Sequence, residues 1–161
     1  MNLILTGSTS GIGWETLKAL LPDFKLVILP VRNLDKAEKM IESLSGKEKI
    51  KLISMDLSEM KEGLDMTFAT NHLGHFLLTQ ELLPALKKGQ ARIINVSSEA
   101  HRISSDPAKD FSIKKSSNTG TAYGKVKLYN ILFSNELKNK YESEGLSSYS
   151  LHPGAVRTAF G

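Results

Sequence analysis

Short apolar runs alternate with longer amphipathic stretches along the whole chain, and this alternation constrains the fold more than any other feature. The runs are rich in leucine or β-branched residues and carry apolar side chains on both faces, which is typical of parallel strands covered on both sides. The predicted strands are NLIL (2–5), KLVILPV (25–31), KIKLISM (49–55), ARIINVS (91–97) and SSYSLH (147–152).

The stretches between these runs have helical spacing and recognisable helix ends. Asn33 is a good N-cap, whereas Pro22 and Gly46 are good stops. The predicted helices span about 11–21, 34–45, 65–86 and 121–141. Because strands alternate with helices, we expect an α/β fold with a doubly wound parallel sheet. The prediction is a Rossmann-like, three-layer α/β/α arrangement of five strands, in a single domain that spans residues 1–161.

A glycine-rich turn, TGSTSGIG, follows the first predicted strand and opens the first helix. Gly7, Gly11 and Gly13 let the backbone turn sharply and approach a pyrophosphate, while the helix N-terminus supplies N–H groups and partial positive charge. The spacing is G-x-x-x-G-x-G rather than G-x-G-x-x-G. An ordinary strand-to-helix turn is the alternative, but its place in the first strand–turn–helix favours nucleotide binding.

The end of the second strand indicates which dinucleotide is bound. A ribose 2′-hydroxyl usually meets a carboxylate here, whereas a 2′-phosphate needs a cation. Arg32 stands at this strand end and Asp35 lies beyond the N-cap Asn33, so the sequence favours NADP over NAD; a solvated arginine is the alternative. Asp56, after the third strand, either caps the next segment or accepts a hydrogen bond from adenine.

Tyr123 and Lys127 lie about one helical turn apart and therefore share a helix face. A nearby ammonium stabilises a tyrosinate, so the pair is suited to general acid–base work. Lys127 could also hold ribose hydroxyls. Ser97 or Ser98, at the end of the fourth strand, could donate to a developing alkoxide. A bare Y-x-x-x-K is common by chance, and only the order of all these motifs makes it informative.

The combination resembles the short-chain dehydrogenase/reductase family, and the sequences of its motifs are similar to those of the retinol dehydrogenase-like, NADP-dependent branch. The matching motifs are TGSTSGIG, VRN, DL, TNHLGHFLLT, RIINVSS, YGKVK and HPGAVRT. The resemblance implies that Tyr123 is the acid/base, that Lys127 is its activator and a ribose ligand, and that Ser98 polarises the substrate carbonyl. Asn71 would complete a proton relay through water.

The resemblance also implies a cofactor site, in which Pro153, Gly154 and Thr158 would line the nicotinamide side. The full set of expected cofactor-binding residues is Gly7, Ser8, Ser10, Gly11, Ile12, Gly13, Arg32, Asn33, Asp56, Leu57, Tyr123, Lys127, Pro153, Gly154 and Thr158.

Composition excludes several other classes of function. The chain has 161 residues and no cysteine, so disulfides and thiolate metal sites are excluded and a reducing, cytoplasmic location is expected. The N-terminus has no basic leader or signal-like run, and no apolar stretch approaches the ~18 residues of a membrane span. Lys+Arg number 21 against 17 Asp+Glu without a basic block, so nucleic-acid binding is not expected.

The spacing of His72 and His75 suggests a metal site, but no third ligand accompanies them at ligand spacing. We therefore expect no bound metal, and packing or a subunit contact explains the pair better. A small carbonyl or alcohol substrate is the expected partner, and a homodimer is an open alternative for the subunit state.

The sequence departs from the family in two places. Between Asp56 and the helix carrying Asn71, roughly one helix-plus-strand unit is absent, together with its N-N-A-G-like motif. The chain also stops at Gly161, soon after HPGAVRT, before the family's substrate-binding segments. If the first strand pairs directly with 91–97, the sheet order becomes 3-2-1-4-5 in this chain's own numbering; otherwise the edges are solvated or paired between chains.

Three functional hypotheses follow from these observations. The first is an NADP-dependent oxidoreductase that transfers hydride between the nicotinamide and a carbonyl or alcohol. The second is a catalytically impaired nucleotide-binding domain, and the third is a truncated, non-functional variant that needs a partner chain. The substrate cannot be read, because the segments that would shape its pocket are mostly missing.

Overall fold

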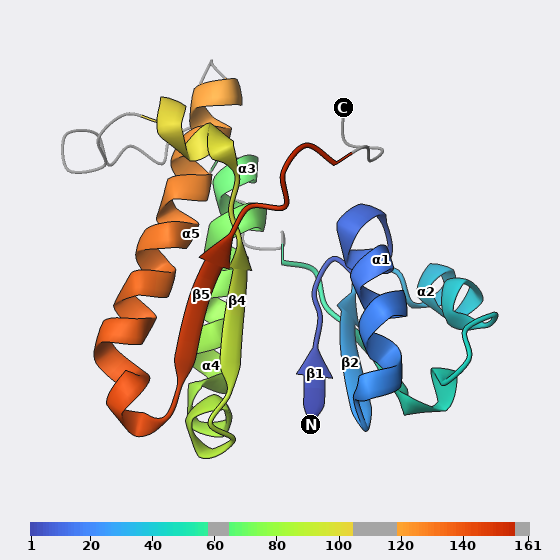
Figure 1. Ribbon diagram of the computed structural model, residues 1–161. Helices are drawn as coiled ribbons and strands as arrows, with labels where there is room; N and C mark the ends of the chain where they lie inside the picture. Colours follow the sequence, from blue (N-terminus) through green and yellow to red (C-terminus); the bar gives the residue numbers. More distant parts are fainter. Residues whose placement is uncertain (58–64, 105–118, 157–161) are drawn as a thin grey trace. The chain divides into compact units, whose positions relative to one another are not determined.

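The computed structural model describes residues 1–57, 65–104 and 119–156, and it contains two compact units (Figure 1). The first comprises Met1–Asp56 with Ala155 and Val156, and the second comprises Leu57–Gly154. The sequence-based expectation of one domain over residues 1–161 stays a prediction.

The first unit is a three-stranded parallel sheet with two helices. Its elements are β1 (Asn2–Ile4), α1 (Gly11–Leu20), β2 (Leu26–Val31), α2 (Leu34–Ile41) and β3 (Ile50–Ser54). The sheet order is β1-β2-β3, with Asn2 opposite Leu26 and Val27 opposite Ile50. The predicted strands and both helices are therefore confirmed to within a few residues at their ends.

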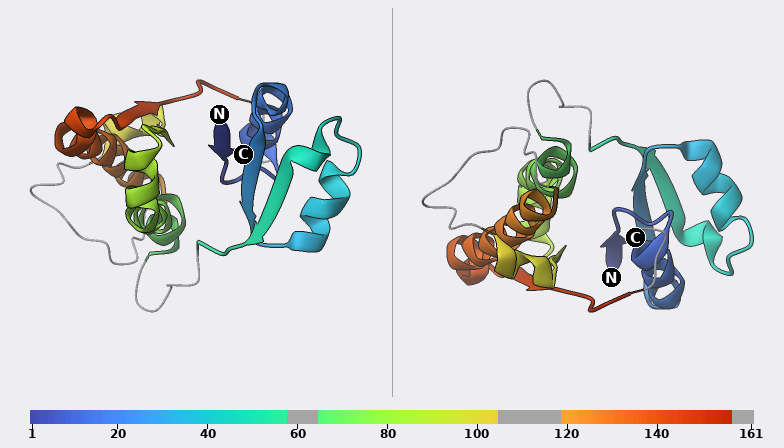
Figure 2. Two further views of the ribbon diagram at one scale, coloured as in Figure 1. Left: turned by 90° about the horizontal axis from the view of Figure 1, so that it is seen from below. Right: turned by 90° about the horizontal axis from the view of Figure 1, so that it is seen from above.

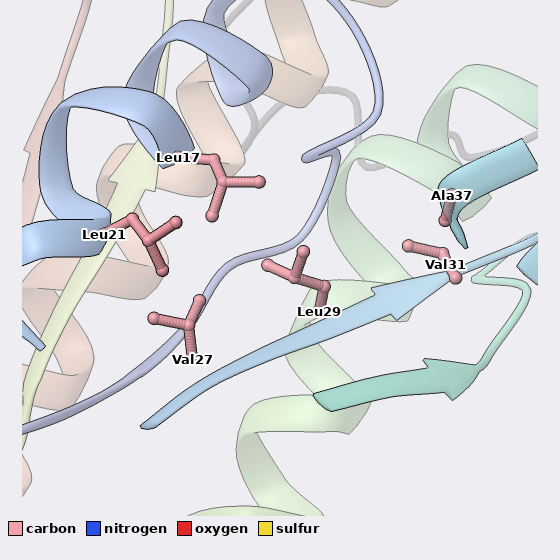
Figure 3. Packing of buried hydrophobic residues seen from close by; sticks show 6 residues of the cluster. All are labelled: Leu17, Leu21, Val27, Leu29, Val31 and Ala37. Atoms are coloured by element: carbon pink, nitrogen blue, oxygen red, sulfur yellow. The ribbon is translucent and has the colours of Figure 1, made fainter. Parts of the chain in front are cut away.

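The core of the first unit lies between α1 and β2 (Figure 3). Val27, Leu29 and Val31 alternate along β2 and so point to one face of the strand. Leu17 and Leu21, one turn apart, point down onto that face from α1 and the short turn that follows it. Leu17 and Val27 are completely buried. This packing holds the start of α1, and with it the glycine-rich turn, at the end of β1.

The second unit contains a long helix, a second helix and two strands. The elements are α3 (Met66–Phe68), α4 (Gly74–Lys88), β4 (Arg92–Val96), α5 (Thr119–Tyr141) and β5 (Ser147–Leu151). A π-helical turn, Ala69–Leu73, joins α3 to α4 and makes residues 66–88 one continuous helix. A 3₁₀ turn, Glu99–Ile103, follows β4.

In the second unit, β4 and β5 form a parallel pair with Ile94 opposite Tyr149 and Val96 opposite Leu151. Helices α4 and α5 lie side by side against one face of this pair in the views of Figure 2. Phe133, Leu137 and Leu146 form the buried core there. The opposite face carries exposed apolar residues, namely Ile94, Val96, Tyr149 and Leu151. Within this unit, helices α4 and α5 cover one face of the pair.

The strands are parallel and joined through helices, which confirms the Rossmann-like α/β class. The pairings β1-β2-β3 and β4-β5 are also found, one in each unit. The conditional pairing of the first strand with residues 91–97 stays a prediction.

No helix in the described parts of the chain is long and apolar enough to cross a bilayer.

The packing of Leu17 predicts its contribution to stability. Leu17→Ala removes a fully buried side chain from the α1–β2 core, and we expect the free energy of unfolding to fall by about 2–5 kcal/mol. Chemical denaturation followed by circular dichroism measures this change. Leu34→Ala, at an exposed leucine of α2, is the matched control and should cost less than about 1 kcal/mol. Equal losses for both variants would contradict the assigned core.

Candidate functional site

The backbone of the glycine-rich turn in the first unit has a conformation and a close packing that favour glycine over residues with a Cβ atom. Gly7 and Gly11 adopt φ values of +65° and +49°, in the left-handed region that favours glycine. A Cβ on Gly13 would lie 2.1 Å from the carbonyl oxygen of Gly7, so the start of α1 packs directly against the turn. The sharp turn expected of these glycines is therefore found, and close approach to a pyrophosphate stays a prediction.

The polar groups of this turn fit an anionic ligand. Ser8 is 1% exposed and its hydroxyl has no hydrogen-bond partner among the described residues. Ser10 is the N-cap of α1, but its side chain does not cap the helix, and the first turn contains no acidic residue. The first N–H groups of α1 thus lack a side-chain acceptor, which is the arrangement that binds phosphate at a helix start. Ile12 lies in this same first turn.

Arg32 and Asn33 follow the end of β2. Arg32 is exposed, and its guanidinium makes no ion pair or hydrogen bond with another residue that the structure describes. The side-chain oxygen of Asn33 accepts a hydrogen bond of 2.8 Å from the backbone N–H of Lys36, so Asn33 is the N-cap of α2 as predicted. Its role as a cofactor ligand stays a prediction.

Asp56 and Leu57 lie at the boundary between the two units. Asp56 is half-buried after β3, and both readings of its role stay open. Leu57 contacts the start of α4, because a Cβ on Gly74 would lie 2.7 Å from the Leu57 Cβ. Leu57 therefore has a packing role in the second unit in addition to its predicted cofactor contact.

The predicted proton-transfer residues gather in the second unit, around the C-terminal end of β4. Lys127 is 8% exposed, and its Nζ donates a hydrogen bond of 3.1 Å to the carbonyl oxygen of Val96. The same ammonium lies 5.3 Å from the centroid of the Tyr123 ring, within the range of a cation–π contact. Burial lowers the pKa of the Lys127 amine. The expected pairing of Tyr123 with Lys127 on one helix face is confirmed.

The two serines at the end of β4 differ in their bonding. The buried hydroxyl of Ser97 donates a 2.8 Å hydrogen bond to the backbone carbonyl of Lys127 and so ties β4 to α5. The Ser98 hydroxyl oxygen instead accepts a 3.2 Å hydrogen bond from the backbone N–H of Ala100, and its own proton is not donated to any residue that the structure describes. This difference favours Ser98 over Ser97 as the donor to a substrate oxygen.

Close packing of α5 against the turn after Ser98 depends on Gly124. A Cβ at this position would lie 2.4 Å from the carbonyl oxygen of Ala100. The residue next to Tyr123 must therefore be small, because any side chain would push α5 away from the 3₁₀ turn. Sequence reasoning did not assign Gly124 a role, although its place inside YGKVK, in mid-helix where glycine costs stability, is a signal for close approach.

Asn71 lies in the π turn between α3 and α4. Its side-chain amide donates a 3.1 Å hydrogen bond to the Thr70 hydroxyl, which in turn donates to the carbonyl of Met66. Its backbone carbonyl accepts a 3.1 Å hydrogen bond from the side-chain amide of Asn130. Turns of this type are rare and often mark functional sites. Sequence patterning predicted a regular helix here and missed both the π turn and Asn130.

The two histidines of the H-x-x-H pattern are packing residues in this structure. The ring of His72 lies 5.5 Å from Phe68 and 5.5 Å from Tyr129, centroid to centroid. Burial, together with the charge of Lys127 and the neighbouring His72, lowers the pKa of His75 to about 4. Within the described residues no group of three or more metal-ligating side chains is found.

The predicted nicotinamide-side residues follow β5. Because β5 runs parallel to β4, with Val96 opposite Leu151, Pro153 and Gly154 leave the sheet at the same end as Ser97 and Ser98. Gly154 has φ +79°, which favours glycine, and both residues are exposed. Thr158 lies outside the described residues. The nucleotide part of the predicted site therefore belongs to the first unit and the proton-transfer part to the second.

Comparison with known proteins agrees with this arrangement. The sequence profile described as "short chain dehydrogenase" matches residues 59–161. The chain belongs to the short-chain dehydrogenase family. Members of this family are oxidoreductases that bind a nicotinamide cofactor and act on small molecules. The chain is 33% identical to retinol dehydrogenase 11 of Homo sapiens over 97% of its own length and 61% of that protein.

Further relatives support the same family. The chain is 33% identical to the WW domain-containing oxidoreductase of Gallus gallus over 94% of its length and 48% of the relative. A solved structure from Mycobacterium paratuberculosis has a TM-score of 0.81 at 26% identity, covering 95% of this chain and 68% of that chain. A short-chain dehydrogenase from Sphingobium yanoikuyae in complex with NADPH has the same fold, with a TM-score of 0.75 at 15% identity over 98% of this chain and 72% of that chain.

The chain spans only part of the length of the relatives that it matches. It spans about three fifths of human retinol dehydrogenase 11 and about half of the chicken oxidoreductase. The alignment with the human protein extends over 194 positions, whereas this chain has 161 residues, so the relative contains residues without a counterpart here.

The lowered pKa of His75 predicts an acid-sensitive second unit. The unfolded chain takes up a proton near pH 6.5 but the folded chain only near 4, so acid favours unfolding in this range. We expect up to about 3 kcal/mol of stability to be lost as the pH falls through this window. His75→Gln should flatten this part of the curve measured by denaturant unfolding. His152→Gln, at an exposed histidine, should leave it nearly unchanged, and an unaltered acid response in His75→Gln would refute the assignment.

Proposed function

We propose that this chain binds NADP(H) and interconverts a carbonyl and an alcohol on a small-molecule substrate. The observation that carries the proposal is the grouping of Tyr123, Lys127 and Ser98 around one end of β4. There a buried amine lies 5.3 Å from the phenol ring, and a serine hydroxyl donates its proton to no residue that the structure describes. An acid/base, a cation that stabilises its anionic form and a hydrogen-bond donor are the groups that carbonyl reduction requires.

The glycine-rich turn and Arg32 support the choice of cofactor. The uncapped start of α1 and the unpartnered hydroxyl of Ser8 would hold the pyrophosphate. Arg32 would hold a 2′-phosphate through two parallel hydrogen bonds, and no carboxylate stands at the end of β2 to prefer a free ribose hydroxyl. This combination favours NADP(H) over NAD(H).

In the reductive direction, the bound nicotinamide supplies a hydride to the carbonyl carbon. The Ser98 hydroxyl would donate a hydrogen bond to the carbonyl oxygen as negative charge develops there. Tyr123 would then transfer its phenolic proton to that oxygen, and the Lys127 ammonium would stabilise the tyrosinate that remains. The Asn71 amide would orient a water that returns a proton to the site. Oxidation of the alcohol reverses each of these transfers.

A nucleotide-binding domain with little or no turnover is the second candidate. The observation in its favour is that roughly one helix-plus-strand unit of the family plan, with its N-N-A-G-like motif, is absent between Asp56 and the helix carrying Asn71. Catalysis demands placement of reacting groups to within about 1 Å, whereas nucleotide binding does not. Binding is therefore expected to survive the shortened sequence better than turnover.

One experiment separates these two candidates. NADPH binding is followed by fluorescence, and carbonyl reduction is assayed on the same sample with a panel of aldehydes and ketones. Robust turnover without any added chain supports the enzyme, and binding without turnover supports the nucleotide-binding domain. A chain that neither binds NADPH nor unfolds cooperatively would overturn both, and would point to a fragment that needs a partner.

The position of Arg32 predicts a selective effect on cofactor affinity. Arg32→Ala should weaken NADPH binding by about tenfold to a hundredfold, because it removes charge-assisted hydrogen bonds to the 2′-phosphate. NADH binding should change by less than about threefold. Arg92→Ala, at an exposed arginine of β4, is the control and should affect neither cofactor. An equal loss for NADPH and NADH would rule out a 2′-phosphate clamp.

The role of Tyr123 predicts a loss of turnover without a loss of binding. Tyr123→Phe removes only the phenolic oxygen, so carbonyl reduction should fall by about a hundredfold or more while NADPH affinity stays nearly normal. Lys127→Ala should harm both turnover and binding, because the amine has two proposed roles. Tyr149→Phe, at an exposed tyrosine, is the control. Turnover that persists in Tyr123→Phe would refute the assignment.

A further inference from the structure

Asn130 is a buried polar residue that neither the motifs nor the proposed chemistry explains. It is 6% exposed and lies on α5, three residues after Lys127. Its side chain makes three hydrogen bonds to residues far away in the sequence. The amide nitrogen lies 3.1 Å from the carbonyl oxygen of Asn71 and 3.3 Å from that of Val96, and the amide oxygen lies 2.9 Å from Nδ1 of His72.

The chemistry of these partners fixes the direction of every bond. Backbone carbonyls only accept, so the NH₂ group of Asn130 must face Asn71 and Val96. Its oxygen therefore faces His72, and Nδ1 of His72 must carry the proton that is donated to it. Burial lowers the pKa of His72, which favours the neutral ring. His72 is consequently held as the tautomer with hydrogen on Nδ1, whereas a ring in water has no such constraint.

The three bonds join the elements that carry the predicted proton-transfer residues. Asn71 lies in the π turn, where the regular helical bonding of its carbonyl is disturbed. Val96 ends β4, and its carbonyl also accepts the hydrogen bond from Lys127. Asn130 itself lies about one turn beyond Lys127 on α5. A single amide thus bridges the π turn, the end of β4 and α5.

We propose that Asn130 is a positioning residue that clamps the π turn carrying Asn71 to the end of β4 and to α5. The clamp keeps the Asn71 backbone at a fixed position relative to the Lys127 amine, because the Asn130 amide donates to the Asn71 carbonyl and shares the Val96 carbonyl as acceptor with that amine. The amide oxygen of Asn130 in turn accepts from Nδ1 of His72 and so holds its tautomer. The catalytic consequence rests on the function proposed above, whereas the clamp itself is a statement about hydrogen bonds and can be tested without turnover.

Nuclear magnetic resonance of the ¹⁵N-labelled chain tests the clamp directly. The imidazole ¹⁵N signals distinguish the two neutral tautomers, and a His72→Phe variant assigns them to this ring. We expect His72 in the wild-type chain to carry its proton on Nδ1 near pH 7. Asn130→Ala should shift the ring toward the other tautomer. Asn135→Ala, at an exposed asparagine of the same helix, should leave the signals unchanged.

Two outcomes would overturn the clamp. A wild-type His72 protonated mainly on Nε2 contradicts the bond directions, and this measurement requires no variant that must fold. An unchanged Nδ1 tautomer in folded Asn130→Ala would show that the amide does not set it. Asn130→Asp is a second variant, with a side chain of the same shape. Its carboxylate oxygens cannot donate to the carbonyls of Asn71 and Val96, so this variant also lacks the two hydrogen bonds of the clamp.

A kinetic comparison then tests the positioning role. Displacement of a reacting group by about 1 Å can cost on the order of a hundredfold in rate, so we expect kcat for carbonyl reduction to fall by about tenfold to a hundredfold in Asn130→Ala. NADPH affinity should change by less than about twofold, and Asn135→Ala should match the wild type. An unchanged kcat would overturn the positioning role. A wild-type chain without turnover would refute the proposed function instead, and the ¹⁵N result would still decide the clamp.

Discussion

The backbone carbonyl of Val96, at the C-terminal end of β4, is the acceptor on which the arrangement of the second unit depends. It receives hydrogen bonds from the Lys127 amine and from the Asn130 amide, both on α5. The neighbouring Ser97 hydroxyl returns a bond to the backbone of α5 at Lys127. Strand and helix are therefore joined in both directions within one helical turn. Since the amine is buried, the free energy of removing it from water must be offset by these bonds.

The two units differ in the residues that hold their predicted site groups in place. In the first, glycines remove steric bulk around the start of α1, and an apolar α1–β2 core holds that helix in place. In the second, the residues proposed for proton transfer are held by buried polar contacts. This difference explains why the second unit contains a network of buried asparagine, serine and lysine, whereas the core of the first is apolar.

The sequence was sufficient to predict the elements of the fold, because strand and helix patterns depend on local spacing. It also predicted the Asn33 cap and the pairing of Tyr123 with Lys127, since both depend on residues three or four positions apart. The bonds of Asn130 could not be predicted in this way, because their partners are 34 to 59 residues distant. A polar residue among the apolar positions of α5 was the available signal, but it does not name its partners.

The π turn at Ala69–Leu73 has a consequence for the phase of the helix that contains it. A turn of this kind accommodates one extra residue, and each residue of an α-helix advances the side-chain direction by about 100°. The faces before and after the turn are therefore out of step, and no single helical period describes residues 66–88. A one-residue deletion there would restore a regular helix and improve its backbone bonding, yet it would rotate Asn71 away from its neighbours. The π turn thus lets the helix of residues 66–88 keep its packing face while Asn71 stays beside its neighbours.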